Sequence, residues 1–317
     1  MPTAPQPGEA ALPHTTVPRL RGERPMQGVL GRMLANFGTD LVPWGREQAK
    51  APSPAAGTGA ASVAARAGTP PIAWGARLWG AGFELPGGAD EIRRLAALLP
   101  LSSDNRLLLG GRGMAGAATV ISGERRCPIS VLVTPEQAPQ TNLSEIMTSQ
   151  RERVTLERWK AGQPAFPRRH HHALLVEAGH LGALPAPLIA ATAAGLYQQA
   201  EIVMVELVQG SRQPEPGLRD RWLFLEGRPA PRPEAEYAAA FAKAGFRVNV
   251  TEDLAERHAV AARRAWARVV EAVSETRPRP PKADIARMVN EIEKWLLRLR
   301  LLEDGAIRML RWHASLR

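Results

Sequence analysis

From residue 74 onward, short apolar runs alternate with stretches whose apolar residues recur every three or four positions. Runs of the first kind predict strands and stretches of the second kind predict helices. The expected strands are 106–109, 129–133, 154–157, 173–177, 201–208, 246–250 and 306–313, and the expected helices between them are 89–99, 115–122, 143–150, 187–199 and 234–244. This alternation predicts an α/β fold with a Rossmann-like, doubly wound sheet of seven strands. The segment 210–233, rich in proline, arginine and glycine, is expected to be a loop.

Two more helices are predicted before the last strand. Apolar spacings of three and four run through 255–273 and again through 285–302, and the prolines of RPRPPK between them exclude one continuous helix. The two helices would form an insertion at about 254–303. Its tryptophans, Trp266 and Trp295, and Trp312 of the last strand fall on apolar faces and are expected in the core, not in a substrate box.

The first 73 residues differ from the rest in composition. They are rich in proline, alanine and glycine, and 49–71 hold too few large apolar side chains to offset the entropy lost on ordering. We expect a flexible arm at 1–73, with a short helix at 26–37 that docks on the body or on a protein partner, followed by one domain at 74–317.

Composition and charge narrow the class of protein. There is one cysteine, Cys127, so no internal disulfide or cysteine-based zinc site is expected, and no apolar run of about 20 residues predicts a membrane span. The N-terminus has no signal-peptide pattern, which favours a cytoplasmic location. The net charge of +10 comes mostly from arginines spread along the chain, which does not favour nucleic-acid binding.

A group of four arginines supports an alternative function, binding to an anionic partner. Arg257, Arg263, Arg264 and Arg268 lie on one predicted helix, largely off its apolar face. Such residues usually form a solvated surface, but they also attract anionic lipids or phosphate-bearing molecules. A basic anchor to nucleic acid or membrane is therefore the weakest of three functional hypotheses.

The strongest chemical signal is the segment RLLLGGRGMAGAA at 106–118, a predicted strand followed by a glycine-rich turn and a helix. Glycine accepts positive φ and leaves room beside the main chain, so a nucleotide-like ligand can lie against such a turn. Turns of this kind also occur where nothing binds. The glycine pattern therefore predicts a ligand site only where other features of the sequence agree with it.

Several segments together resemble the class I S-adenosylmethionine-dependent methyltransferases, in particular bacterial members that modify small molecules and lipids. LWGAGFELPGG at 78–88 resembles the aromatic and glycine-rich segment before the first strand, and LGGRGMAG at 109–116 resembles the first glycine motif. AGFRVNVTEDL at 244–254 and the closing RWHASLR resemble the last two strands. The resemblance implies S-adenosylmethionine as cofactor, a small-molecule or lipid acceptor, and cofactor contacts by Gly87, Gly88, Gly111, Gly113 and Gly116.

The glycine motif departs from that family pattern at three positions. Leu109 stands in place of the acidic residue, Ala115 in place of the third glycine, and Arg112 lies between the two retained glycines. The retained glycines favour a cofactor site. The departures favour a descendant that no longer uses one.

The other acidic anchors of the family are also replaced. The second strand ends in Val133 and Thr134, with Glu136 beyond it, where the family has an acid for the ribose hydroxyls. After the third strand, Arg158-Trp159-Lys160 stand where an acid meets the adenine amine. Each ribose hydroxyl or adenine amine of the cofactor that is left buried without a partner costs roughly 1–3 kcal/mol of binding free energy. Thr134 as a ribose partner and Trp159 as a stacking partner for adenine would compensate in part.

Candidate catalytic groups lie in or after the fourth strand. In the run 170–172, His170 and His172 share one strand face, but no carboxylate completes a metal set. A histidine such as His172, near the carboxyl end of the strand, would instead suit a general base. Glu177 and His180 follow the strand and are candidates for a catalytic or a capping role.

Two functions of different classes follow. The first is transfer of a methyl group from S-adenosylmethionine to an unidentified small molecule or lipid. The alternative is a catalytically inactive protein with the same fold that serves in binding or assembly, with the N-terminal arm as a tether to a protein partner. Binding of the cofactor separates the two.

Overall fold

The computed structural model describes residues 74–134, 152–159, 170–275 and 282–317. The predicted arm at 1–73, its helix at 26–37 and the helix at 143–150 lie outside the described residues. Within the described part, no helix is long and apolar enough to cross a lipid bilayer.

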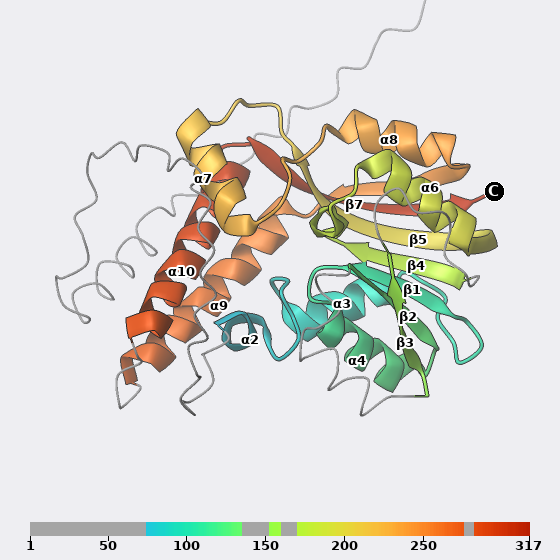
Figure 1. Cartoon of the computed structure of the whole chain (residues 1–317), viewed down its shortest axis with the longest axis horizontal. Helices are drawn as coiled ribbons and strands as arrows, with labels where there is room; N and C mark the ends of the chain where they lie inside the picture. Colours follow the sequence, from blue (N-terminus) through green and yellow to red (C-terminus); the bar gives the residue numbers. More distant parts are fainter. Residues whose placement is uncertain (1–73, 135–151, 160–169, 276–281) are drawn as a thin grey trace, which may run out of the picture. The chain divides into compact units, whose positions relative to one another are not determined.

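A seven-stranded sheet forms the centre of the domain (Figure 1). Its strands are β1 (Leu107–Gly111), β2 (Ile129–Val133), β3 (Val154–Arg158), β4 (His170–Val176), β5 (Leu196–Gln209), β6 (Phe246–Asp253) and β7 (Ile307–Leu316). Their order in the sheet is β3-β2-β1-β4-β5-β7-β6. All neighbouring pairs are parallel except those of β7, which runs antiparallel to β5 and β6. The predicted doubly wound sheet of seven strands is confirmed.

Helices cover the sheet on both faces. The helices α3 (Gly88–Ala96) and α4 (Met114–Arg125) pack together on one face, and α6 (Pro185–Gly195) and α8 (Glu234–Lys243) on the other (Figure 1). Because both faces are covered, the central strands are largely apolar, and every residue of β1 is buried. The core on the α6 and α8 side includes Leu108, Leu175, Met204, Phe241 and Trp312.

The predicted two-helix insertion is confirmed between β6 and β7. It consists of α9 (Ala255–Glu275) and α10 (Lys282–Glu303), which contact the short helix α2 (Trp74–Trp79). The core position of the three tryptophans is also confirmed, since Trp266, Trp295 and Trp312 are each at most 3% exposed.

The segment predicted as a loop contains a helix, α7 (Pro216–Glu226), which packs on α10. The prediction was wrong because it weighed overall composition over position: Pro216 occupies the first helical turn and Gly227 the left-handed position after the last, the usual places of these residues in a helix. Two element ends also differ. The helix α6 ends at Gly195, and β5 extends to Leu196 on the side of its amino end.

Candidate functional site

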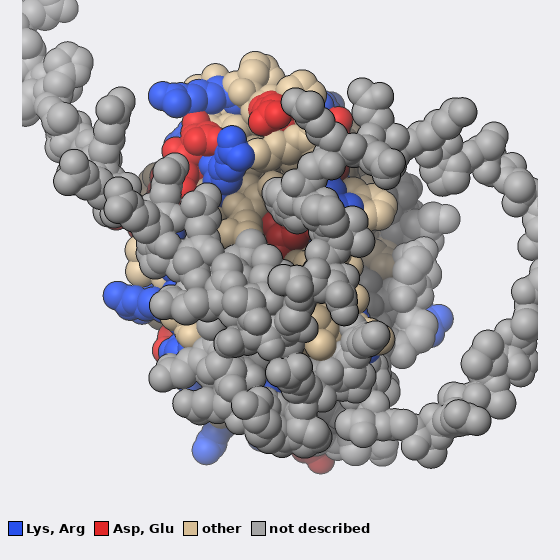
Figure 2. Space-filling model, turned by 90° about the vertical axis from the view of Figure 1, so that its left-hand side faces the viewer, with Lys and Arg blue, Asp and Glu red and all other residues tan. Residues whose placement is uncertain are grey.

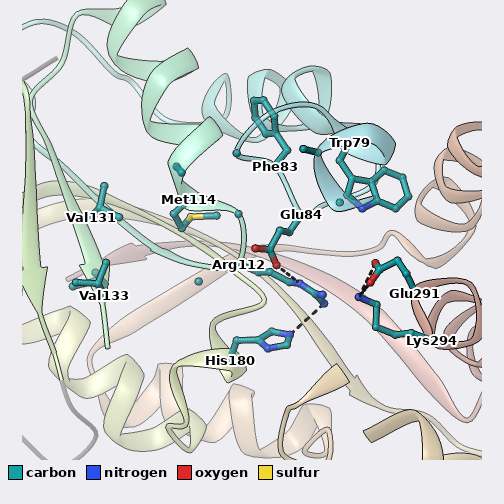
Figure 3. Close-up of a pocket in the computed structure, with 17 residues that line it drawn as sticks. Trp79, Phe83, Glu84, Arg112, Met114, Val131, Val133, His180, Glu291 and Lys294 are labelled. Carbon is teal, nitrogen blue, oxygen red and sulfur yellow. Dashed lines mark hydrogen bonds and ion pairs between the residues drawn. The ribbon is translucent and has the colours of Figure 1, made fainter. Parts of the chain in front are cut away.

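A cavity of about 350 Å³ opens at the carboxyl ends of β1 and β2. In parallel α/β sheets, ligands bind at this edge. The described residues that line it come from α2 and the following loop, the glycine turn, β2, the turn after β4, and α10 (Figure 3): Gly75, Ala76, Trp79, Gly82, Phe83, Glu84, Gly111, Arg112, Gly113, Met114, Ala115, Val131, Leu132, Val133, His180, Glu291 and Lys294.

The glycine turn is built by close contacts between chain segments. Gly111 has φ +115°, and a Cβ there would overlap the carbonyl oxygen of Val176 in β4. Gly113 has φ +64°, and a Cβ there would overlap the backbone nitrogen of Glu84. Both glycines line the cavity. Their conformations are required for packing as well as for any ligand, so the glycine pattern by itself does not identify what binds.

Two ion pairs lie on the cavity wall (Figure 3). In the turn, Arg112 Nε lies 2.9 Å from Glu84 Oε2. On α10, Lys294 Nζ lies 2.7 Å from Glu291. The cavity therefore presents two cations and two carboxylates from separate elements, next to an apolar wall that includes Met114, Val131 and Val133.

Behind the cavity, Arg112 joins a buried ionic network. Its Nη1 lies 2.6 Å from Glu226 Oε2 on α7, and Arg298 of α10 lies between the same Glu226, at 3.2 Å, and Glu177 after β4. The side chains of Glu177, Glu226 and Arg298 are fully buried. The network thus connects the glycine turn, the end of β4, α7 and the insertion.

A third arginine, Arg228, balances the remaining buried charge. Arg228 Nη2 lies 2.9 Å from Glu206 Oε1, and its Nη1 lies 3.8 Å from Glu177 Oε2. Three arginines, Arg112, Arg228 and Arg298, thereby face three buried carboxylates. Because the buried charges compensate one another, the network does not require a ligand charge for its stability.

Glu177 adopts an unusual backbone conformation, left-handed at φ 47° and ψ 46°, immediately after β4. A residue other than glycine rarely adopts this region. In this conformation the carboxylate accepts hydrogen bonds from Arg298, and Nε2 of His180 lies 3.7 Å away. Glu177 therefore acts as a structural anchor of the network, and His180 is the member of the pair that lines the cavity.

The network makes stability dependent on pH. Burial alone would raise the pKa of Glu226, but Arg112 and Arg298 outweigh it and lower the pKa to about 2. Arg298, His180 and Arg112 likewise outweigh burial at Glu177 and hold its pKa well below the usual range. A depressed folded-state pKa stabilises the fold above the unfolded-state pKa, and this stabilisation is lost as pH falls toward the folded-state pKa.

We therefore expect the free energy of unfolding to fall by about 2 kcal/mol or more between about pH 5 and about pH 3. Urea unfolding at a series of pH values measures it. In Glu226→Gln the same curve should be flatter, because this variant has one fewer carboxylate to protonate. An equal slope in the two proteins would contradict the assignment.

The other predicted cofactor residues lie at different depths around this site. Thr134 follows β2 and is half-buried, and Gly116 packs against the ring of Phe83. Trp159 is 2% exposed and belongs to the core cluster, not to the described lining of the cavity. Gly87 and Gly88 line a different hollow, between α3 and α9.

The three histidines of β4 lie at the opposite end of the sheet. The register pairs His172 with Leu107, the first residue of β1, so the run is at the amino end of β4 and not near its carboxyl end as predicted. His170 contacts the carbonyl of Gly195, and Nδ1 of His171 accepts from the amide of Arg106. The predicted strand, 173–177, begins after the three histidines and β4 begins at His170, so both boundaries place the run at the amino end, and the assignment of His172 to the carboxyl end was wrong. His172 therefore lies away from the cavity.

Sequence reasoning missed Glu84, Glu226, Arg298 and Lys294 as members of the site. Glu226 was missed because the helix that carries it, α7, was not predicted. Arg298 and Lys294 lie off the apolar positions of the predicted helix, so from sequence they resemble ordinary solvated residues. Among the described residues, no group of three or more His, Cys, Asp or Glu could hold a metal ion.

The described part of the face in Figure 2 carries acidic and basic side chains next to one another, not a field of one sign. The exposed ion pairs have the same character, for example Arg221 with Glu293 and Arg93 with Glu124. The excess positive charge of the chain is therefore not concentrated on this part of the surface.

No family model and no curated protein matches the sequence. Similarity is found among solved structures. Phosphoethanolamine N-methyltransferase 2 of Haemonchus contortus, in complex with phosphomonomethylethanolamine and S-adenosylhomocysteine, aligns with a TM-score of 0.65 and 14% identity over 76% of this chain. This chain spans 56% of the length of that protein.

Two further structures align over most of their own length. Geranyl diphosphate C-methyltransferase of Streptomyces coelicolor gives a TM-score of 0.54 and 14% identity over 71% of this chain and 78% of that one. The cyclopropane synthase MmaA2 of Mycobacterium tuberculosis gives 0.54 and 18% over 71% and 82%. These likenesses show the fold: the chain has the seven-stranded fold of class I S-adenosylmethionine-dependent methyltransferases.

Proposed function

We propose that the cavity at the glycine turn binds S-adenosylmethionine and that the protein transfers its methyl group to a small molecule or lipid. The observation that carries this proposal is the cavity wall. It combines apolar side chains with two ion pairs, one at the glycine turn and one on α10. The cofactor combines a flat purine with a zwitterionic amino-acid end, and both find complementary groups there.

The residues present fit the two ends of the cofactor. Met114, Val131 and Val133 offer an apolar surface for a purine ring. Arg112 and Lys294 are donors for its carboxylate, and Glu84 and Glu291 are acceptors for its ammonium group. When the ligand binds, each of these side chains exchanges its partner in the protein for a charged group of the ligand. The number of charge-assisted contacts is then conserved, so binding leaves no buried charge without a partner.

The bound cofactor would supply an electrophilic methyl group, and the chain would orient the acceptor and exclude water. Trp79 and α10 close the cavity on the side of the insertion (Figure 3). His180 is the candidate base for a proton of the acceptor, because its imidazole lines the cavity with its side chain 12% exposed. Glu177 is a positioning residue, since Arg298 occupies its carboxylate.

The acceptor class rests on the structural neighbours. Complexes of two of them contain phosphomonomethylethanolamine and geranyl diphosphate. A small molecule or lipid acceptor is consistent with a cavity that lies beneath a helical insertion.

Calorimetric titration with S-adenosylmethionine and S-adenosylhomocysteine tests the proposal. We expect saturable one-to-one binding, weakened about tenfold in Lys294→Gln because a charge-assisted contact to the carboxylate is lost. Lys243→Gln is the matched control: it removes the same charge from an exposed position on α8. A flat titration at millimolar ligand, or equal weakening by the two variants, would reject cofactor binding at this cavity.

A second function, non-catalytic binding or assembly on the same fold, has its own support. Arg112 already pairs with Glu84 and Glu226, and among the described lining residues none of the carboxylates lies at the end of β2, where the ribose acid is expected. This alternative predicts the flat titration. A stable, folded protein that binds neither ligand would establish it over methyl transfer.

A further inference from the structure

A second, larger hollow lies between α3 and α9, and Trp79 lines both this hollow and the cavity at the glycine turn. The volume of the hollow is about 640 Å³. Buried Leu78, Trp79 and Ala265 form an apolar floor with Val260 and Ala261. We call this hollow the α3–α9 groove, and its charged lining residues are Asp90, Arg94, Glu256, Arg257, Arg264 and Arg268.

The arginines of the groove differ in how they are paired. Arg94 and Arg257 both contact Glu91, at 3.3 and 2.7 Å. Arg264 and Arg268 are exposed, lie one helical turn apart on α9, and have no carboxylate partner among the residues that the structure describes. Their guanidinium groups are available for an anion at the edge of an apolar surface.

Gly87 and Gly88, at the start of α3, also line the groove. Asp90 and Glu91 lie in the same first turn, and the amides of Gly88 and Asp90 already donate to the carbonyls of Leu85 and Gly87, so this helix start offers little to an anion. The attraction for an anion therefore comes from the two exposed arginines.

The groove continues inward into a smaller cavity of about 40 Å³ that shares Gly87, Arg94, Arg257 and Ala261 with it. Val205 and Met309 make much of this inner end apolar. His258 also lines it, is 5% exposed, and has no hydrogen-bond partner for Nε2 among the described residues. A buried polar atom without a partner costs free energy, which a hydroxyl or water in this cavity would recover.

We propose that the α3–α9 groove binds an anionic amphiphile, a molecule with a phosphate or carboxylate head and an apolar body. The head pairs with Arg264 and Arg268, and the body lies on the floor formed by Leu78, Trp79 and Val260. Apolar burial and charge pairing act together, so neither part alone binds as well. This site is separate from the cofactor cavity, and the proposal does not depend on methyl transfer.

Calorimetry of the full chain with monomeric decyl phosphate tests this site, with inorganic phosphate and decanol as the two part-ligands. We expect saturable binding of decyl phosphate, at least about tenfold tighter than of either part. The variant Arg264→Gln/Arg268→Gln should weaken it by about tenfold or more. The control Arg247→Gln/Arg300→Gln removes two exposed arginines outside the groove and should leave it unchanged.

A second variant, Ala261→Phe, keeps every charge and fills the groove, and should abolish binding while the thermal unfolding transition is retained. Three results would overturn the proposal: equal affinity in both double variants, inorganic phosphate binding as tightly as decyl phosphate, or binding only to phosphatidylcholine vesicles that contain phosphatidic acid. The last result would identify a membrane surface instead of a single bound molecule. Binding of S-adenosylmethionine has no bearing on any of these measurements.

Discussion

Replacement of Arg298 by methionine should lower the free energy of unfolding by about 3–5 kcal/mol, the usual cost of removing one partner from a buried ion pair. Arg298 is 0% exposed and bridges Glu177 and Glu226, whose carboxylates would be left buried with fewer donors. Methionine keeps most of the side-chain volume, so the loss reports on charge more than on packing. Urea unfolding at neutral pH measures it.

The control is Arg300→Met, two residues along the same helix and exposed, which should change stability by less than about 0.5 kcal/mol. Adding Glu226→Gln to Arg298→Met should recover part of the loss, because one stranded carboxylate becomes neutral. If this double variant is less stable than Arg298→Met alone, the network is not the source of the effect. The contact of Arg298 with the Trp295 ring, 4.9 Å to its centroid, would then be the first alternative.

Replacement of Gly111 by alanine should cost more than about 4 kcal/mol or prevent folding. Two effects add: the backbone at φ +115° is strained for any residue with a Cβ, and that Cβ would overlap the carbonyl oxygen of Val176. Since Arg112 donates its amide to this same carbonyl, at 2.8 Å, the turn cannot shift without breaking a contact between β1 and β4. The yield of soluble protein and its thermal midpoint measure the effect.

Gly123→Ala is the matched control in the following helix. Gly123 is exposed in α4, and a Cβ there would meet nothing within 4 Å. Alanine in a helix interior is favoured over glycine, so this variant should be more stable than the parent by about 0.5–1 kcal/mol. Similar behaviour of the two variants would mean that the glycine turn tolerates rearrangement, which would contradict its tight packing.

The fold was predictable from sequence because its signals are local and repeated. Buried parallel strands such as 129–133 are mostly apolar runs, and the apolar spacing of the two insertion helices is regular over 15 residues or more. The helix α7 was not predicted because its eleven residues lie in a segment of loop-like composition. The residues at its two ends indicate the helix more clearly than that composition does. The start of β4 was misplaced because histidine is not read as a strand residue.

The site was less predictable than the fold. Gly111 and Gly113 were found because a turn of positive φ leaves a glycine pattern in the sequence. The charged partners of Arg112 come from positions 84 and 226, far apart along the chain, and no local pattern pairs them. Arg112 itself read as a departure from a motif, whereas the structure gives it three carboxylates within 4 Å.

That network has a consequence for how the domain opens. Glu226 is shared by Arg112 of the glycine turn and Arg298 of the insertion, and Glu177 by Arg298 and Arg228. No one of these segments can detach without exposing or stranding charge in the others. Amide hydrogen exchange in the turn, α7 and the central part of α10 should therefore proceed through one cooperative opening, with a common protection factor, and not through separate local fluctuations.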